Sequence, residues 1–106
     1  MQVIMNDLTG VKVAFFGTPE FALKFLSYLY ENNAEISFIV TQPPSASGRG
    51  KKLNPSPVQK WGVKKNLKVY SPNKINDPNF RKDIEKEKVD FVIVVAYGNL
   101  IDDFII

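Results

Sequence analysis

The sequence predicts an α/β fold, an open and mostly parallel sheet with flanking helices. Two observations carry this prediction. Short apolar runs rich in β-branched and aromatic residues alternate with segments of helical periodicity, and a capping residue or proline stands where each helix should begin. Strands that alternate with helices form parallel sheets through right-handed crossovers. At 106 residues and 44% hydrophobic, the chain is long enough to pack one domain core.

The first strand is predicted over Val11 to Phe16, an apolar run that ends at Gly17. We expect Thr18 to cap the following helix and Pro19 to occupy its first position, where a missing N–H costs nothing. Apolar residues at helical spacing continue this helix to about residues 31–33. The first unit is therefore a strand, a tight turn and a helix.

The second strand is predicted over Ile36 to Thr41 and is followed by a loop without periodicity, residues 42–56. Ser56 and Pro57 then form an N-cap and first helical position, with Gln59 at the third. The sequence therefore predicts a short second helix directly after the loop.

A weaker third strand is predicted over Leu67 to Ser71, and Asp77 with Pro78 predicts the start of a third helix. The fourth strand, Val89 to Tyr97, is apolar on both faces, as a central parallel strand should be. The predicted order is βαβαβαβ.

The carboxyl ends of parallel strands share one edge of the sheet, and ligands of open α/β sheets bind at that edge. Three segments should converge there, namely residues 17–20, the loop 42–56 and residues 96–99. We expect a binding site at this junction.

Charge is unevenly distributed along the chain. From residue 36 to 76 there are eight Lys or Arg and no Asp or Glu, which leaves 6 basic and 11 acidic residues elsewhere. This segregation favours a polyanionic partner, with nucleic acid ahead of phosphorylated metabolites or a membrane surface. A solvated basic face without a partner is the alternative.

The loop 42–56 concentrates this charge. Long loops inside a compact domain are usually functional or disordered. Gly48 and Gly50 flank Arg49, whose guanidinium can bind phosphate through two parallel hydrogen bonds, and Lys51 and Lys52 add point charges. A mobile solvent loop remains the alternative reading.

Composition also excludes several classes of site. Cysteine and histidine are both absent, which excludes disulfides and thiolate chemistry and leaves carboxylates, Lys or Tyr for proton transfer. The stretch "FFGTPEFA" has one glycine where a dinucleotide site needs G-x-G-x-x-G. We expect no metal, no signal peptide and no membrane span, hence a cytoplasmic protein, with residues 1–10 as a flexible extension.

Three segments, in their order and spacing, resemble the N-terminal part of the methionyl-tRNA formyltransferase family: "FFGTPEFAL", "VTQPPSASGRGKKLNPSPV" and "VDFVIVVAYGNLI". The resemblance covers residues 11–106 and implies a Rossmann-like sheet. Its most specific part is "GRGKKLNPSPV" after "TQP", because related folate-dependent formyltransferases share the sheet and the "AYG"-like turn but lack this insertion.

The resemblance implies an activity, the transfer of a formyl group from 10-formyltetrahydrofolate to the α-amino group of methionyl initiator tRNA. It implies that the backbone of four residues lies at the folate pocket: Val95, Ala96, Tyr97 and Gly98. It implies that the basic loop contacts the tRNA acceptor stem, with Arg49 as a principal contact beside Gly48, Gly50, Lys51 and Lys52. The turn near the reacting centre corresponds to Gly17, Thr18, Pro19 and Phe21.

By the same resemblance, the catalytic Asn-x-His pair and a later Asp lie beyond Ile106. We therefore expect residues 1–106 to be the N-terminal part of a catalytic domain, to contain no catalytic residue and to be inactive alone, and the full-length protein to be a monomer. Two other functions remain open. One is a folate-dependent formyltransferase with a sugar-nucleotide or glycinamide ribonucleotide acceptor, and the other is a non-catalytic RNA-binding α/β module.

Overall fold

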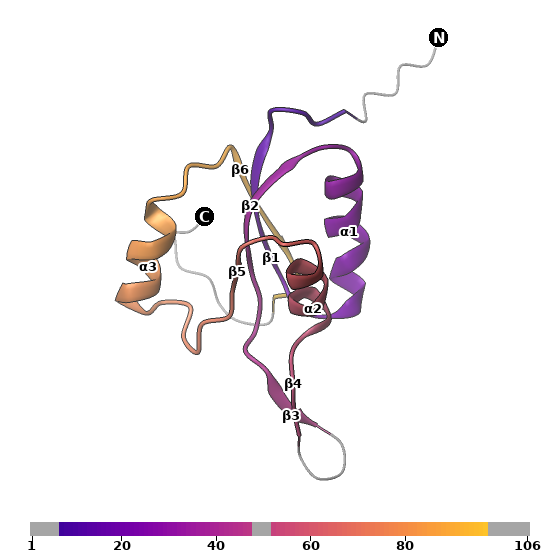
Figure 1. The fold of residues 1–106 in the computed structure, drawn as a ribbon. Helices are drawn as coiled ribbons and strands as arrows, with labels where there is room; N and C mark the ends of the chain where they lie inside the picture. The colour runs from indigo at the N-terminus through magenta and orange to yellow at the C-terminus, as the bar shows by residue number, and fades with distance from the viewer. Residues whose placement is uncertain (1–6, 48–51, 98–106) are drawn as a thin grey trace.

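A computed structural model describes residues 7–47 and 52–97 of the chain. Its main sheet has four strands in the order β5-β2-β1-β6, and each neighbouring pair is parallel (Figure 1). The strands are β1 (Lys12–Gly17), β2 (Glu35–Val40), β5 (Val69–Tyr70) and β6 (Phe91–Val95). The predicted α/β, Rossmann-like fold is confirmed.

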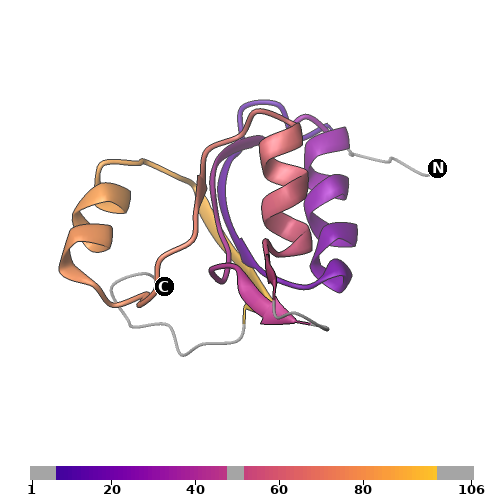
Figure 2. The ribbon, with the colours of Figure 1, turned by 60° about the horizontal axis from the view of Figure 1, so that its bottom comes forward.

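The helices cover both faces of this sheet. Figure 2 shows α1 (Glu20–Glu31) and α2 (Pro57–Lys64) side by side on one face and α3 (Pro78–Glu85) on the other. The molecule therefore has three layers, with the sheet in the middle. This arrangement explains why residues 13–16, 38–40 and 91–95 form unbroken apolar runs rather than alternating with polar residues.

Strand β1 supplies side chains to both cores. Val13 and Phe15 are buried with residues of α1 and α2, whereas Ala14 and Phe16 are buried in the cluster that includes Phe80 of α3. Successive side chains of a strand point to opposite faces, so one unbroken apolar run serves two cores. Each face of the sheet thus has its own continuous apolar layer.

Two of the predicted helix starts are confirmed. Ser56 Oγ accepts a hydrogen bond from Gln59 N at 3.0 Å at the start of α2, and Asp77 Oδ1 accepts one from Asn79 N at 2.7 Å at the start of α3. The predicted cap of α1 is wrong. Pro19 is the N-cap residue there and makes no side-chain cap. The Thr18 hydroxyl bonds across the sheet edge instead.

The segment 42–56 is more ordered than the sequence predicts. β3 (Ser45–Ser47) and β4 (Lys52–Asn54) pair as an antiparallel hairpin that projects beyond the sheet (Figure 1). The expectation of a loop without secondary structure is therefore wrong for these six residues. Backbone hydrogen bonding between the two arms fixes where the tip of the hairpin begins.

The ends of the described chain differ in their packing. Leu8, within the predicted flexible extension, donates its N–H to Asn32 O at 2.6 Å and packs against the core under α1 and α2, while residues 1–6 lie outside the described residues. β6, expected to be a central strand, is an edge strand of the described sheet. Phe91 and Val94 on it are 60% and 44% exposed.

Candidate functional site

Three segments far apart in the sequence meet at the carboxyl edge of the sheet. The Thr18 hydroxyl donates to Tyr97 O at 3.0 Å and accepts from Gln42 N at 3.2 Å. The Gln42 side-chain amide also donates to Tyr97 O, at 3.0 Å. The predicted convergence of the turn after β1, the segment after β2 and the end of β6 is confirmed.

Close packing at Gly17 allows this junction to form. A Cβ atom placed there would lie 2.7 Å from Phe15 Cε2, 2.9 Å from Val95 O and 3.0 Å from the Ala22 Cβ. Because real Cβ atoms do not approach other atoms so closely, any larger residue would separate α1 from β6. Gly17 therefore serves the close approach of the turn to the neighbouring strand.

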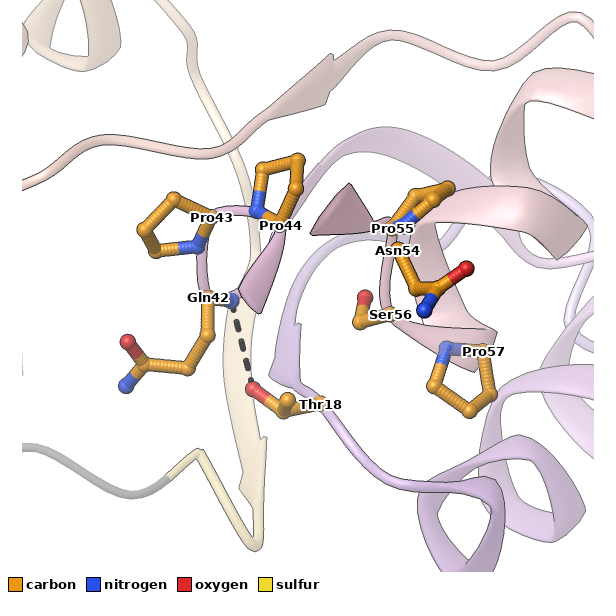
Figure 3. A pocket seen from close by; sticks show the side chains of 8 residues that line it. All are labelled: Thr18, Gln42, Pro43, Pro44, Asn54, Pro55, Ser56 and Pro57. Atoms are coloured by element: carbon orange, nitrogen blue, oxygen red, sulfur yellow. Dashed lines mark hydrogen bonds between the residues drawn. The ribbon is translucent and has the colours of Figure 1, made fainter. Parts of the chain in front are cut away.

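A pocket of about 610 Å³ opens beside the junction. Proline rings stand on both sides of it, Pro43 and Pro44 on one side and Pro55 and Pro57 on the other (Figure 3). The remaining lining residues are Thr18, Gln42, Asn54 and Ser56. These eight residues include no charged side chain, so the pocket presents mainly flat apolar surfaces.

Several polar groups of the pocket wall are already bonded within the protein. Ser56 Oγ accepts from Gln59 N and shares a second hydrogen bond of 2.6 Å with the buried Thr41 hydroxyl. Val58 N donates to Thr18 O at 3.5 Å, which joins α2 to the turn after β1. This network holds the walls in place. The chemistry that it offers a ligand is contact and orientation, since none of the lining side chains titrates near neutral pH.

The predicted folate-binding residues divide into two groups. Val95 is half-buried at the end of β6, and Ala96 is exposed with a φ of 52°, in the left-handed region that a residue with a Cβ adopts at a cost. Gly98 lies outside the described residues. Ala96 thus places an exposed, strained peptide at the edge of the sheet.

The side chain of Tyr97 lies in the core, whereas its backbone carbonyl lies at the junction. The side chain is 2% exposed and packs edge to face against Phe16, with ring centroids 5.9 Å apart. Burial raises the pKa of the Tyr97 hydroxyl, which is buried and has no hydrogen-bond partner among the described residues. The Tyr97 ring therefore closes the core.

The predicted RNA-binding residues follow the first arm of the hairpin in the sequence. Gly48, Arg49, Gly50 and Lys51 fall outside the described residues, and Lys52 is the first residue of β4. The two arms of the hairpin end at these positions, with Ser47 paired to Lys52. The structure therefore locates the base of this segment and leaves the roles of its basic side chains as predictions.

Only part of the turn that was predicted to lie near the reacting centre faces the junction. Thr18 lies within it and lines the pocket, and Pro19 is half-buried. Phe21 is 59% exposed in the first turn of α1, where its ring packs edge to face against Phe25 at 5.5 Å between centroids. These four turn residues, Gly17 included, do not line one pocket together.

Sequence reasoning missed the residues that form most of the pocket. Gln42 joins the segment after β2 to the end of β6, and four prolines form the walls. The repeated prolines in "QPP" and "NPSP" were the available signal, because pairs of prolines at both ends of one loop predict rigid, apolar surfaces.

Two other kinds of site are absent from the described part of the chain. Residues 7–47 and 52–97 contain no group of three or more Asp or Glu side chains that could hold a metal ion. None of the helices described is long and apolar enough to cross a membrane.

Comparison with known proteins identifies related sequences. The formyl transferase family matches residues 11–106. The methionyl-tRNA formyltransferase of Sulfurihydrogenibium sp. (strain YO3AOP1) is 41% identical over 97 residues, which is 91% of this chain and 31% of the relative. Those of Alkaliphilus oremlandii (strain OhILAs) and Clostridioides difficile (strain 630) are each 40% identical over 91 residues, or 86% of this chain and 29% of the relative.

The predicted resemblance is confirmed by these matches. The chain spans about three-tenths of the length of these relatives, 29–31%. The matched region includes the β3–β4 hairpin and the junction at the carboxyl edge.

Proposed function

Because the chain belongs to the formyl transferase family, we propose that it forms the N-terminal part of a methionyl-tRNA formyltransferase. The whole enzyme would transfer a formyl group from 10-formyltetrahydrofolate to the α-amino group of methionyl initiator tRNA, in the cytoplasm, at the start of translation. The observation that carries this proposal is the 41% identity across 91% of the chain to a relative of that name.

The junction at the carboxyl edge supports a positioning role for this chain. Thr18 and Gln42 hold Tyr97 O, so the end of β6 is fixed relative to the proline-lined pocket. Positioned backbone groups and a preformed apolar pocket are the features that ligand sites in open α/β sheets share.

For the folate co-substrate, the structure offers a partial fit. Val95 and the exposed Ala96 peptide would contact it at the edge of the sheet, and the left-handed φ of Ala96 is the kind of strain found at ligand sites. The co-substrate supplies the formyl carbon that the amine attacks. The resemblance assigns deprotonation of the amine and stabilisation of the oxyanion to residues that follow the match in the relatives.

For the tRNA, the hairpin supports a contact with the acceptor stem. Arg49 and Lys51 stand in the sequence between its two paired arms, and Lys52 begins the second arm, so we propose that these three residues meet the acceptor stem. Phosphate oxygens suit a guanidinium fork and lysine ammonium groups, and no acidic residue lies between residues 36 and 76 to compete for them.

Formylation kinetics of the protein at the length that its gene encodes would test this function. We expect transfer to methionyl initiator tRNA, and we expect Arg49→Ala to lower kcat/KM for the tRNA about 10- to 100-fold with the KM for folate unchanged, as for the loss of one or two charge-assisted hydrogen bonds. Arg81→Ala, which removes the same type of side chain from α3 on the face of the sheet opposite to α1 and α2, is the matched control (Figure 2). Transfer to a sugar nucleotide or glycinamide ribonucleotide in place of the tRNA would contradict the proposal.

A further inference from the structure

Helix α2 carries a second group of cations, separate from the hairpin tip. Lys60 and Lys64 lie one turn apart and are exposed, and Lys65, also exposed, follows at the C-cap. Residues four apart lie on the same side of a helix. We call Lys60 and Lys64, together with Lys65 at the C-terminal end of the helix, the α2 basic face.

These three lysines keep their charge uncompensated. Helix α2 has no acidic residue, and none of the three forms an ion pair with a described carboxylate. Lys68, from the same acid-free segment, differs because it pairs with Glu87. The α2 basic face therefore attracts anions from solution, whereas the charge of Lys68 is balanced within the protein.

Two aromatic rings hold Lys65 in place. Its Nζ lies 5.2 Å from the centroid of Tyr30 and 5.9 Å from that of Trp61, and the two rings pack edge to face at 5.3 Å. A cation–π contact restrains an ammonium group without neutralising it. Lys65 can therefore meet an anion at a smaller cost in side-chain entropy than a free lysine.

The position of α2 joins this face to the proposed site. Two residues separate the helix from β4, and its first residue, Pro57, lines the pocket. Figure 1 shows α2 beside the base of the hairpin. An RNA that reaches the hairpin and the pocket would thus pass close to α2.

We propose that the α2 basic face binds the phosphate backbone of the same tRNA whose acceptor end meets the hairpin. This inference rests on the proposed function, since it takes its partner from it. Lysine ammonium groups recognise phosphates as point charges and do not read bases, so the surface would supply affinity and salt dependence rather than sequence specificity.

Helix α3 offers a matched control for a binding test. Lys82 and Lys86 are also four residues apart and exposed, but they lie on the other face of the sheet, beside Asp83 and Glu85. The variants Lys60→Gln/Lys64→Gln and Lys82→Gln/Lys86→Gln therefore remove the same charge from two helices of equal length.

The measurement is the dissociation constant of initiator tRNA over a series of salt concentrations, with the protein at the length that its gene encodes. Each phosphate that the protein no longer neutralises should make the slope of log K against log salt shallower by about 0.7 to 0.9. We expect the α2 pair to reduce the slope by about 1 to 2 and to weaken binding about 3- to 30-fold at low salt. The α3 pair should change affinity less than about 2-fold.

The outcomes separate this inference from the proposed function. Suppose that the Lys60→Gln/Lys64→Gln variant binds tRNA as the Lys82→Gln/Lys86→Gln variant does, while Arg49→Ala still impairs formylation. The proposal that the α2 basic face binds tRNA is then wrong, and the proposed function stands. Suppose instead that the parent protein does not formylate tRNA, but the Lys60→Gln/Lys64→Gln variant still has a shallower slope of log K against log salt. The proposed function is then wrong, and the proposal that the α2 basic face binds RNA stands. Unfolding midpoints equal to the parent value would show that the exposed substitutions leave the fold intact.

Discussion

Helices α2 and α3 begin alike and lie on opposite faces of the same sheet. Each has eight residues, each starts with a capping side chain followed by proline, and each buries two residues against the sheet. Their charges differ: α2 has lysines and no acid, whereas α3 mixes Arg81 and Lys82 with Asp83 and Glu85. The local signal that starts a helix is therefore independent of the surface that the helix presents.

The two helices also differ in how they approach the sheet. A Cβ atom placed at Gly62 of α2 would lie 2.6 Å from Val69 Cγ2 and 3.0 Å from Ile39 Cδ1, so the backbone of α2 packs closely against side chains of β5 and β2. Helix α3 instead contacts the sheet through the side chains of Phe80 and Ile84. Close backbone contact on one face and side-chain contact on the other predict different responses to core truncation.

Core truncation should have the largest effect, and a larger one on the α3 face. Phe80→Ala removes a ring that packs edge to face against Tyr70 at 5.6 Å, and we expect a loss of about 3 to 4 kcal/mol in the free energy of unfolding. Val58→Ala in α2 removes two methyl groups and should cost about 2 kcal/mol. Chemical denaturation of both variants measures the difference. A greater loss for Val58→Ala would show that α2 carries more of the core than the geometry indicates.

Removal of a helix cap should have an intermediate effect on the free energy of unfolding. Here we expect the larger loss for α2 and the smaller one for α3. Ser56→Ala removes the cap of α2 and leaves the buried Thr41 hydroxyl without its partner, so we expect a loss of about 2 kcal/mol. Asp77→Ala removes only an exposed cap and should cost about 1 kcal/mol.

Denaturation midpoints measure both losses, and Ser56→Thr serves as the control. Threonine keeps the hydroxyl that caps α2 and bonds Thr41, so this variant should retain most of the stability. Equal losses for the two alanine variants would mean that the bond between Ser56 and Thr41 contributes nothing measurable.

These caps also show what the sequence could predict. A capping side chain followed by proline acts over three residues, so Ser56 and Asp77 were identified correctly from local sequence. Thr18 has the same local signal, but its hydroxyl bonds to Tyr97 O, 79 residues away. Such a partner is visible only once the fold brings β1 and β6 together.

Neither the hairpin nor the pocket was predicted from the sequence, and the reasons are related. The arms "SAS" and "KLN" have three residues each, too few for alternation to mark a strand, and no β-branched residue, so their pairing was not predicted. Likewise, Gln42 gives no local indication that its amide will hold the end of β6. The parallel sheet and its binding edge were predictable because both follow from the alternation of strands and helices, whereas the position of β6 at the edge of the described sheet was not predicted.

A smaller effect concerns one buried polar atom on each face. Tyr97 Oη lies in the core under α3 and Gln59 Oε1 lies on α2, and neither has a hydrogen-bond partner among the described residues. Tyr97→Phe removes an unsatisfied hydroxyl and should raise the free energy of unfolding by up to about 1 kcal/mol near neutral pH. Gln59→Met is the matched change on the other face and should act in the same direction.

High pH separates these two variants, since only one of the two side chains titrates. Burial raises the pKa of Tyr97 above its ordinary value of 10.0, so the unfolded chain loses this proton first as pH rises. The free energy of unfolding of the parent protein is therefore unaffected by this titration below about pH 10. It falls as pH rises through the higher folded pKa. Denaturation at pH 9 and pH 11 should show a smaller decline for Tyr97→Phe than for the parent, and an unchanged decline for Gln59→Met. A loss of stability in Tyr97→Phe at pH 9 would instead show that the hydroxyl has a partner outside residues 7–47 and 52–97.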